Sequence, residues 1–208
     1  MPLHVVDHPL IVHKLSILRD KTTSVKKFRE VVNEITLLLA YEATRDLPMD
    51  DVDVETPLCT AHTRMLKQGE LVVAPILRAG LGMMPGMLDI LPTARVAHLG
   101  LKRDEQTHKP ITYYMNMPTS LKGAIVLVVD PMLATAGSLC AAIDLLKEQQ
   151  PAKIVAVCLI AAPEGAQRME TTHPDVHIYV GALDEKLNER AYIVPGLGDA
   201  GDRMFGTA

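Results

Sequence analysis

The chain has 208 residues, 48% hydrophobic and 22% charged, which suits one globular domain over residues 1–208 with a full hydrophobic core. A formal net charge of -4 argues against nucleic acid or an anionic membrane as the main partner. The sequence shows no signal-peptide pattern, no apolar run of about 18 residues and no closely spaced cysteines, so we expect a cytoplasmic protein.

Apolar residues at helical spacing and short apolar runs alternate along most of the chain. In chain order they predict helices over 8–18 and 24–45, an edge strand over 51–56 with a partner over 61–66, a strand over 71–77, a helix over 81–91, strands over 94–101 and 124–129, a helix over 137–149, a strand over 153–161, a helix over 163–172 and a strand over 176–182. Strands that alternate with helices imply an α/β fold in which helices flank a central, mainly parallel sheet.

Two segments lack this alternation. Residues 103–120 have little apolar periodicity but contain a β-prone stretch at 111–114, which predicts a protruding hairpin or arm. Residues 188–208 are rich in glycine and proline and predict an ordered but irregular C-terminal segment.

Three candidate ligand-binding positions follow predicted strands. In open α/β sheets, ligands bind beyond the carboxyl ends of the strands. Arg78, Arg103 and Asp130 each come at such an end. Planar arginine side chains suit a diphosphate, although an isolated arginine at a strand end is more often a surface ion-pair partner.

The segment that begins at Asp130 has the composition of a ribose-phosphate site. A carboxylate can accept hydrogen bonds from sugar hydroxyls. The small-residue turn 134–138 and the start of the next predicted helix can surround a phosphate with N–H groups. The turn is not a P-loop, because it lacks the Gly-Lys-Ser/Thr ending.

Three blocks of the sequence resemble the uracil phosphoribosyltransferases, a branch of the type I phosphoribosyltransferases. Residues 73–83 are similar to the family's diphosphate-binding turn, residues 130–138 to its ribose-phosphate loop, and residues 192–202 to its uracil-binding hood. The similarity is co-linear from about His8 to the C-terminus. It implies a type I phosphoribosyltransferase fold with a β-arm at about 103–120 and a hood at about 188–208.

The resemblance also implies a reaction and its residues. Uracil would react with 5-phosphoribosyl 1-diphosphate, the donor, to give UMP and diphosphate in pyrimidine salvage. The implied catalytic residues are Asp130, Arg78 and Arg103. The implied donor-binding residues are Arg78, Arg103, Asp130, Pro131, Met132, Leu133, Ala134, Thr135, Ala136, Gly137, Ser138 and Asp199. The implied uracil-binding residues are Ile193, Gly198, Asp199 and Ala200, with backbone groups of Ile193, Gly198 and Ala200 facing the base.

The family uses Mg²⁺ held mainly by the oxygens of the donor, so no dedicated protein metal site is expected. A homo-oligomer, a dimer or larger, is also implied. Some relatives are activated by GTP, and the sequence leaves open whether this chain is.

The chain departs from the family pattern at two positions. Ala136 stands where a glycine is usual, and Pro131 follows Asp130 where the wider superfamily often has a second acid. Since alanine is disfavoured in the left-handed conformation, we expect a negative φ at Ala136, with Gly137 supplying any unusual backbone shape.

Two other functions compete with this reading. A regulator that senses the same sugar phosphate and binds nucleic acid would need a basic patch or an added helix-turn-helix, and neither is visible. The second competing function is a phosphoribosyltransferase for another base. An enzyme for orotate, which carries a carboxylate, would be expected to have a cationic side chain in the hood, and residues 193–200 contain none.

Overall fold

The computed structural model describes residues 3–67, 69–103 and 110–207. Its helices are α1 (Pro9–Arg19), α2 (Val25–Ala43), the 3-10 turn η1 (Ala79–Met83), α3 (Met84–Ile90), α4 (Gly137–Lys147), α5 (Pro163–Thr172) and α6 (Ala200–Phe205). Its strands are β1 (Leu3–Val5), β2 (Met49–Glu55), β3 (Thr60–Leu66), β4 (Leu71–Leu77), β5 (Arg95–Val96), β6 (His98–Arg103), β7 (Pro110–Asn116), β8 (Ile125–Val129), β9 (Met132–Leu133), β10 (Lys153–Ala161), β11 (His177–Leu183), β12 (Lys186–Leu187) and β13 (Ile193–Val194).

A mixed, mostly parallel sheet forms the centre of the molecule, in the order β1-β11-β10-β8-β4-β6-β7. Only the β6–β7 pair on this path is antiparallel. The central strands β4, β8 and β10 are almost entirely buried, and their continuous apolar sequences are typical of a parallel sheet covered on both faces. The predicted α/β class is confirmed.

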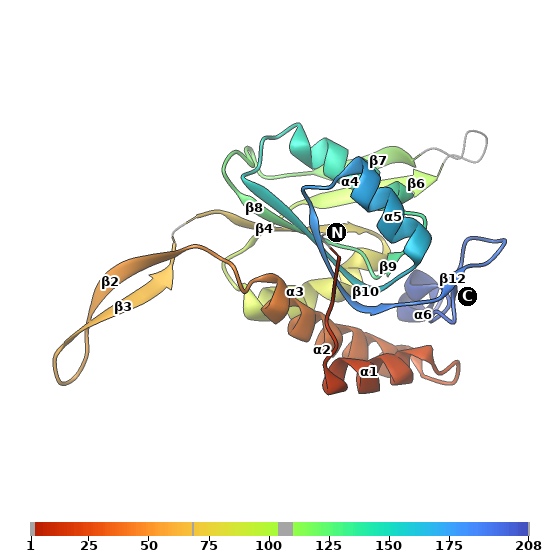
Figure 1. Cartoon of the computed structure of the whole chain (residues 1–208), viewed down its shortest axis with the longest axis horizontal. Coiled ribbons are helices and arrows are strands. Elements are labelled where there is room, and N and C mark those ends of the chain that lie inside the picture. Colours follow the sequence, from red (N-terminus) through yellow and green to blue (C-terminus); the bar gives the residue numbers. More distant parts are fainter. Residues whose placement is uncertain (1–2, 68, 104–109, 208) are drawn as a thin grey trace.

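Side-chain alternation along the strands divides the core into two layers. Val73 and Val129 point toward α1, α2 and α3, whereas Val72 and Val128 point toward α4 and α5. Figure 1 shows α1, α2 and α3 below the sheet and α4 and α5 above it. Because these strands run parallel, their carboxyl ends meet at one edge of the sheet, which is where ligands bind in such sheets.

Two hairpins differ from the expected arrangement. The strands predicted at 51–56 and 61–66 do pair with each other, but as the separate ribbon β2–β3, which projects away from the sheet (Figure 1). The predicted pairing is confirmed, but the ribbon does not join the main sheet: its apolar face, with Val52, Val54, Ala61 and Met65, is not packed on the core, and nearly every side chain of the ribbon is exposed.

The second hairpin is formed by β6 and β7. In the segment where we expected an arm, β7 is the last strand of the main sheet. Residues 104–109, which include the expected tip, lie outside the described residues. In the parts of the chain that are described, no helix is both long and apolar enough to cross a membrane.

Candidate active site

The turn that follows β4 lies directly against the end of β8. Gly80 is buried, and a Cβ atom at this position would lie 2.5 Å from the carbonyl oxygen of Val129. Only glycine permits this approach, which places the Arg78 turn (residues 78–80) beside Asp130. The Arg78 side chain is exposed and forms no hydrogen bond or ion pair with any residue that the structure describes. Its guanidinium group is therefore available to a ligand at the sheet edge.

Asp130 is held at this edge by the backbone of the neighbouring strand. Its N–H donates to the carbonyl of Val157 at 3.2 Å, and its Oδ1 accepts from the N–H of Met132 at 3.4 Å. Burial raises the pKa of the Asp130 carboxyl group to about 7, and the Met132 N–H partly opposes this shift. A desolvated carboxyl group at a strand end, with one weak internal partner, is suited to bind polar groups of a ligand.

The phosphate loop (residues 134–138) joins β9 to α4 and is supported from behind by α5. A Cβ atom at Gly165 would lie 2.2 Å from the carbonyl oxygen of Ala134, so α5 and the loop are in backbone contact. Arg168 Nη1 donates to the carbonyl of Thr135 at 3.2 Å. The N-cap residue of α4, Ala136, has no side chain that could cap the helix, so among the described residues the first N–H groups of α4 suit an anion.

The backbone of Ala136 contradicts our expectation. Ala136 has φ 60° and ψ 7°, the left-handed conformation, whereas Gly137 is not among the residues with positive φ. Alanine there costs about 1 kcal/mol relative to glycine. However, Ala136 is only 5% exposed and its methyl group packs in the core cluster on the α4 side, where burying one such group contributes about 0.8 kcal/mol. The two effects nearly offset one another, which explains why alanine is compatible with this loop.

The described part of the C-terminal hood (residues 188–207) lies over the same edge of the sheet. β13 pairs antiparallel with β12, and α6 then begins at Ala200. A Cβ atom at Gly201 would lie 3.7 Å from the Cβ of Ala79, so the start of α6 is next to the Arg78 turn. Ile193 and Ala200 are buried, whereas Gly198 is exposed and has a φ of 79°. The structure thus brings the hood beside the predicted donor-binding residues.

Two predicted site residues have particular environments. Asp199 is the N-cap of α6, since its Oδ1 accepts from the N–H of Asp202 at 2.9 Å. Arg103 is the last residue of β6, so its backbone lies near the same edge, but its side chain is outside what the structure describes. Its role in binding the donor stays a prediction.

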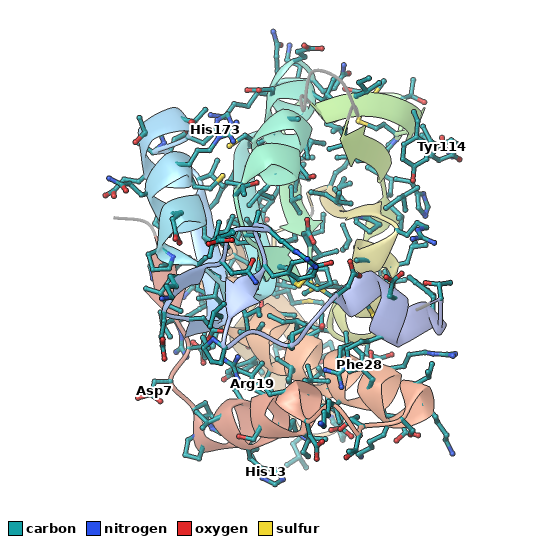
Figure 2. The ribbon with its side chains drawn as sticks, turned by 90° about the vertical axis from the view of Figure 1, so that its right-hand side faces the viewer. Asp7, His13, Arg19, Phe28, Tyr114 and His173 are labelled. Atoms are coloured by element: carbon teal, nitrogen blue, oxygen red, sulfur yellow. The ribbon has the colours of Figure 1, made fainter. Side chains whose placement is uncertain are left out.

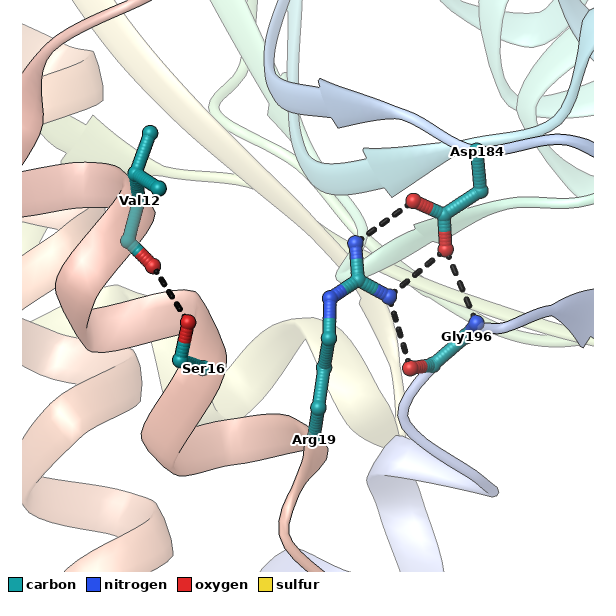
Figure 3. Close-up of polar contacts among 5 residues, drawn as sticks. All are labelled: Val12, Ser16, Arg19, Asp184 and Gly196. Carbon is teal, nitrogen blue, oxygen red and sulfur yellow. Dashed lines mark hydrogen bonds and ion pairs between the residues drawn. The ribbon is translucent and has the colours of Figure 1, made fainter.

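Three charged residues at the hood were not foreseen. Arg19 at the end of α1 pairs with Asp184, and both bond to the backbone of Gly196 (Figure 3). Arg203 of α6 lies over the ring of Phe28, 4.4 Å from its centre. Arg19 and Phe28 lie on the part of the helical layer next to the C-terminal segment (Figure 2). The one available signal was Asp184, which, like Asp130, follows a predicted strand.

A parallel sheet with an acid, a phosphate-type loop and a helix N-terminus at its open edge defines the type I phosphoribosyltransferase fold. A solved hypoxanthine-guanine phosphoribosyltransferase from Bacillus anthracis shares this fold, with a TM-score of 0.54 at 17% identity over 77% of this chain and 80% of its own. The AQ2163 protein of Aquifex aeolicus is far more similar: its structure matches with a TM-score of 0.93 at 42% identity and 99% coverage of both chains.

The family itself is shown by sequence. The family described as uracil phosphoribosyltransferase matches residues 5–207. The uracil phosphoribosyltransferase of Symbiobacterium thermophilum is 61% identical over 98% of this chain and 97% of its own length. That of Geobacillus kaustophilus is 55% identical over 99% and 98%, respectively. The chain belongs to the uracil phosphoribosyltransferase family.

Proposed function

We propose that the open edge of the sheet carries out the family's reaction. The phosphoribosyl group of 5-phosphoribosyl 1-diphosphate is transferred to uracil, giving UMP and diphosphate, a step of pyrimidine salvage. The observation that carries this proposal is the convergence at one edge of the Arg78 turn, Asp130, the phosphate loop and the hood. The Arg78 turn suits the diphosphate, Asp130 the ribose, the phosphate loop the 5-phosphate and the hood the uracil base.

The donor occupies the half of the site made by β4, β8 and α4. The phosphate loop and the first turn of α4 hold the 5-phosphate, Asp130 accepts hydrogen bonds from the ribose hydroxyls, and Arg78 and Arg103 bind the diphosphate. When the C1–O bond breaks, positive charge develops on the ribose and negative charge on the leaving diphosphate. Arginine side chains placed at the diphosphate stabilise that leaving charge.

Uracil occupies the half of the site beneath the hood. Backbone N–H and C=O groups at Ile193, Gly198 and Ala200 match the alternating carbonyl and N–H groups of the base, and Asp199 lies between base and donor. Uracil N1 must be held in line with C1 of the ribose, where the N1–C1 bond forms as the bond to diphosphate breaks and the N1 proton is released, so positioning supplies much of the rate. Cytosine would leave one buried polar group unpaired, which costs roughly 1–3 kcal/mol.

Mg²⁺ fits this site as an ion bound chiefly by the donor. Within the described ranges no three histidine, cysteine or acidic side chains form a cluster suited to a metal, while Asp130 offers one desolvated carboxylate at the edge. Mg²⁺ is commonly bound by one or two carboxylates together with substrate phosphates. When bound, it would neutralise part of the diphosphate charge.

We also propose that the protein is a cytoplasmic homo-oligomer. Cys59, Cys140 and Cys158 are all unpaired, which fits a reducing compartment. An isolated two-stranded ribbon is marginally stable by itself, and β2–β3 exposes Leu58 and Met65 to solvent, so a second copy is a suitable partner for it. Light scattering will give the assembly size, with a dimer or larger expected.

GTP activation is proposed from family membership alone. Initial rates measured with and without GTP, at donor concentrations below KM, test it directly. A higher rate with GTP, and no change with ATP, is the expected result.

A product assay with a panel of bases tests the function. With labelled donor, Mg²⁺ and uracil, cytosine, orotate or hypoxanthine, the expected product is UMP from uracil. Cytosine should be used with a kcat/KM about 5–150-fold lower, the equivalent of one unpaired polar group. Equal use of hypoxanthine or orotate would contradict the assignment of the hood to uracil.

A further inference from the structure

The hood is tied to the rest of the molecule by one sheltered ion pair. Arg19 Nη2 donates to Asp184 Oδ1 at 2.5 Å, and Arg19 Nη1 donates to Asp184 Oδ2 at 2.7 Å. The Asp184 side chain is only 3% exposed and that of Arg19 26%. Figure 3 shows the planar guanidinium facing the carboxylate with both donors engaged. This two-bond geometry fixes orientation as well as distance.

The same pair bonds both polar backbone groups of Gly196. Its N–H donates to Asp184 Oδ2 at 2.9 Å, and its carbonyl accepts from Arg19 Nη1 at 2.7 Å. Gly196 has a φ of 63°, and a Cβ there would lie 2.1 Å from the carbonyl oxygen of Ile193. The pair therefore holds a tight turn between Ile193 and Gly198, two positions whose backbone groups are proposed to contact uracil.

A second arginine reinforces the attachment from the other side. Arg203 of α6 donates to the carbonyl of Leu197 at 2.7 Å, to that of Asp20 at 2.6 Å and to that of Leu18. Leu18 and Asp20 flank Arg19 at the end of α1. Both arginines thus join residues 196 and 197 to the same end of α1.

The pair also links the hood to the catalytic edge. Asp184 follows β11, and its N–H donates to the carbonyl of Ala161, the last residue of β10. β10 in turn pairs with β8, whose next residue is Asp130. The phosphate loop, in contrast, is supported by Gly165 and Arg168 of α5 and has no bond to Arg19 or Asp184. The Arg19–Asp184 pair therefore has no direct bond to the donor loop, although α5, which supports that loop, also reaches β12 through the bond from the Leu187 N–H to Glu164 Oε1 at 2.9 Å.

We propose that Arg19 and Asp184 are positioning residues for the nucleobase. They act through the backbone of Gly196, which sets where the hood presents its N–H and C=O groups to the base. The inference rests on the proposed role of the hood in binding uracil. A displacement of about 1 Å in such a site lowers the rate by about 10²-fold, so loss of the pair should weaken uracil use while donor binding is retained.

Steady-state kinetics of Asp184→Asn and Arg19→Gln test this inference. We expect the KM for uracil to rise about 10–100-fold and the KM for the donor to change less than about 3-fold. The matched control is Lys14→Gln, which removes an ion pair between α1 and α2 that does not touch the hood and whose Nζ–Oε2 distance is also 2.5 Å. Both KM values should then stay within about 3-fold of wild type.

Two controls separate a loss of folding from a loss of positioning: the melting temperature of each variant, and the conservative variant Arg19→Lys. Arg19→Lys keeps the charge but not the planar pair of donors, so its uracil KM should lie between those of wild type and Arg19→Gln. Suppose that the wild type forms UMP and that the variants melt at a lower temperature but have the wild-type KM for uracil. The pair would then be merely structural, and the inference would be overturned. Equal increases in both KM values also overturn it. A wild type that forms no UMP would instead contradict the proposed function.

Discussion

The donor half and the base half of this site are built in opposite ways. The ribose-phosphate part of the donor half is local, because Asp130, β9, the phosphate loop and the start of α4 follow one another within residues 130–138, whereas Arg78 and Arg103 lie at the ends of other strands. The base half is assembled from distant segments, since Arg19 and Asp184 are 165 residues apart in the chain. We infer that a substitution can weaken binding of the donor without weakening binding of uracil, and the reverse.

The largest effect is expected for Asp130→Asn in the donor half. Loss of a hydrogen bond to a charged group costs roughly 1.5–3 kcal/mol, so kcat/KM for the donor should fall about 10–150-fold. Since burial raises the pKa of this carboxyl group, its charge disfavours the fold at neutral pH. The variant should therefore melt at the same temperature as wild type, or higher, at pH 8. Near-wild-type turnover would remove Asp130 from the proposed role.

Gly165→Ala should impair the donor half without touching the hood clamp formed by Arg19, Asp184 and Gly196. The new Cβ would lie 2.2 Å from the carbonyl oxygen of Ala134, so the phosphate loop must shift. We expect the donor KM to rise about 10–100-fold. Gly69→Ala is the matched control, because the nearest atom to its Cβ would be 3.8 Å away, an ordinary contact. An unchanged donor KM in Gly165→Ala would show that the loop does not depend on α5.

The ionisation of Asp130 should make the stability of the fold and the donor kcat/KM depend on pH in opposite directions. Its pKa in the folded chain is about 7 and its ordinary value is 3.8, so the stability it contributes is greatest below about pH 4 and is lost as pH rises through 7. Donor kcat/KM should rise over pH 6–8 by up to about tenfold per pH unit, because the ionised form accepts the sugar hydroxyls. Calorimetric melting and initial rates across this range are the measurements. A flat rate profile would mean that ionisation of Asp130 does not limit the donor step.

The smallest effect is expected for Ala136→Gly. The left-handed conformation is already present in the folded chain, so its cost of about 1 kcal/mol falls on folding rather than on donor binding. Glycine removes that cost but also loses about 0.8 kcal/mol of methyl burial. Donor KM should change less than about 3-fold and stability by less than about 1 kcal/mol. A donor KM at least tenfold lower would show that alanine strains the loop against its ligand.

The contrast between the halves also explains what the sequence could predict. Strand, acid, small-residue turn and helix follow one another in the donor half, so local patterns locate it to within a few residues. The same holds for α1, α2 and α5. The φ of Ala136 was predicted wrongly, because the preference of alanine was followed rather than the glycine usual at this position, which is typical of a positive φ. The buried methyl group that offsets the cost depends on long-range packing.

The hood clamp could not be derived from local pattern. Nothing near Arg19 distinguishes it from a surface arginine at a helix end, and its partner is reached only through the fold. The pairing of β2 with β3 was predicted, but the separation of this ribbon from the main sheet was not, because alternation predicts a strand but not the sheet it joins. Of these residues only Asp184 could have been noticed in the sequence, because it is an acidic residue just after a predicted strand, as Asp130 is.

The most direct test of separately held halves is one steady-state assay with Gly165→Ala and Asp184→Asn side by side. KM values for uracil and for the donor are measured for each variant under the same conditions. The predicted result is a crossover: Gly165→Ala raises the donor KM about 10–100-fold with little change for uracil, and Asp184→Asn does the reverse. Proportional increases in both KM values for both variants would contradict the account.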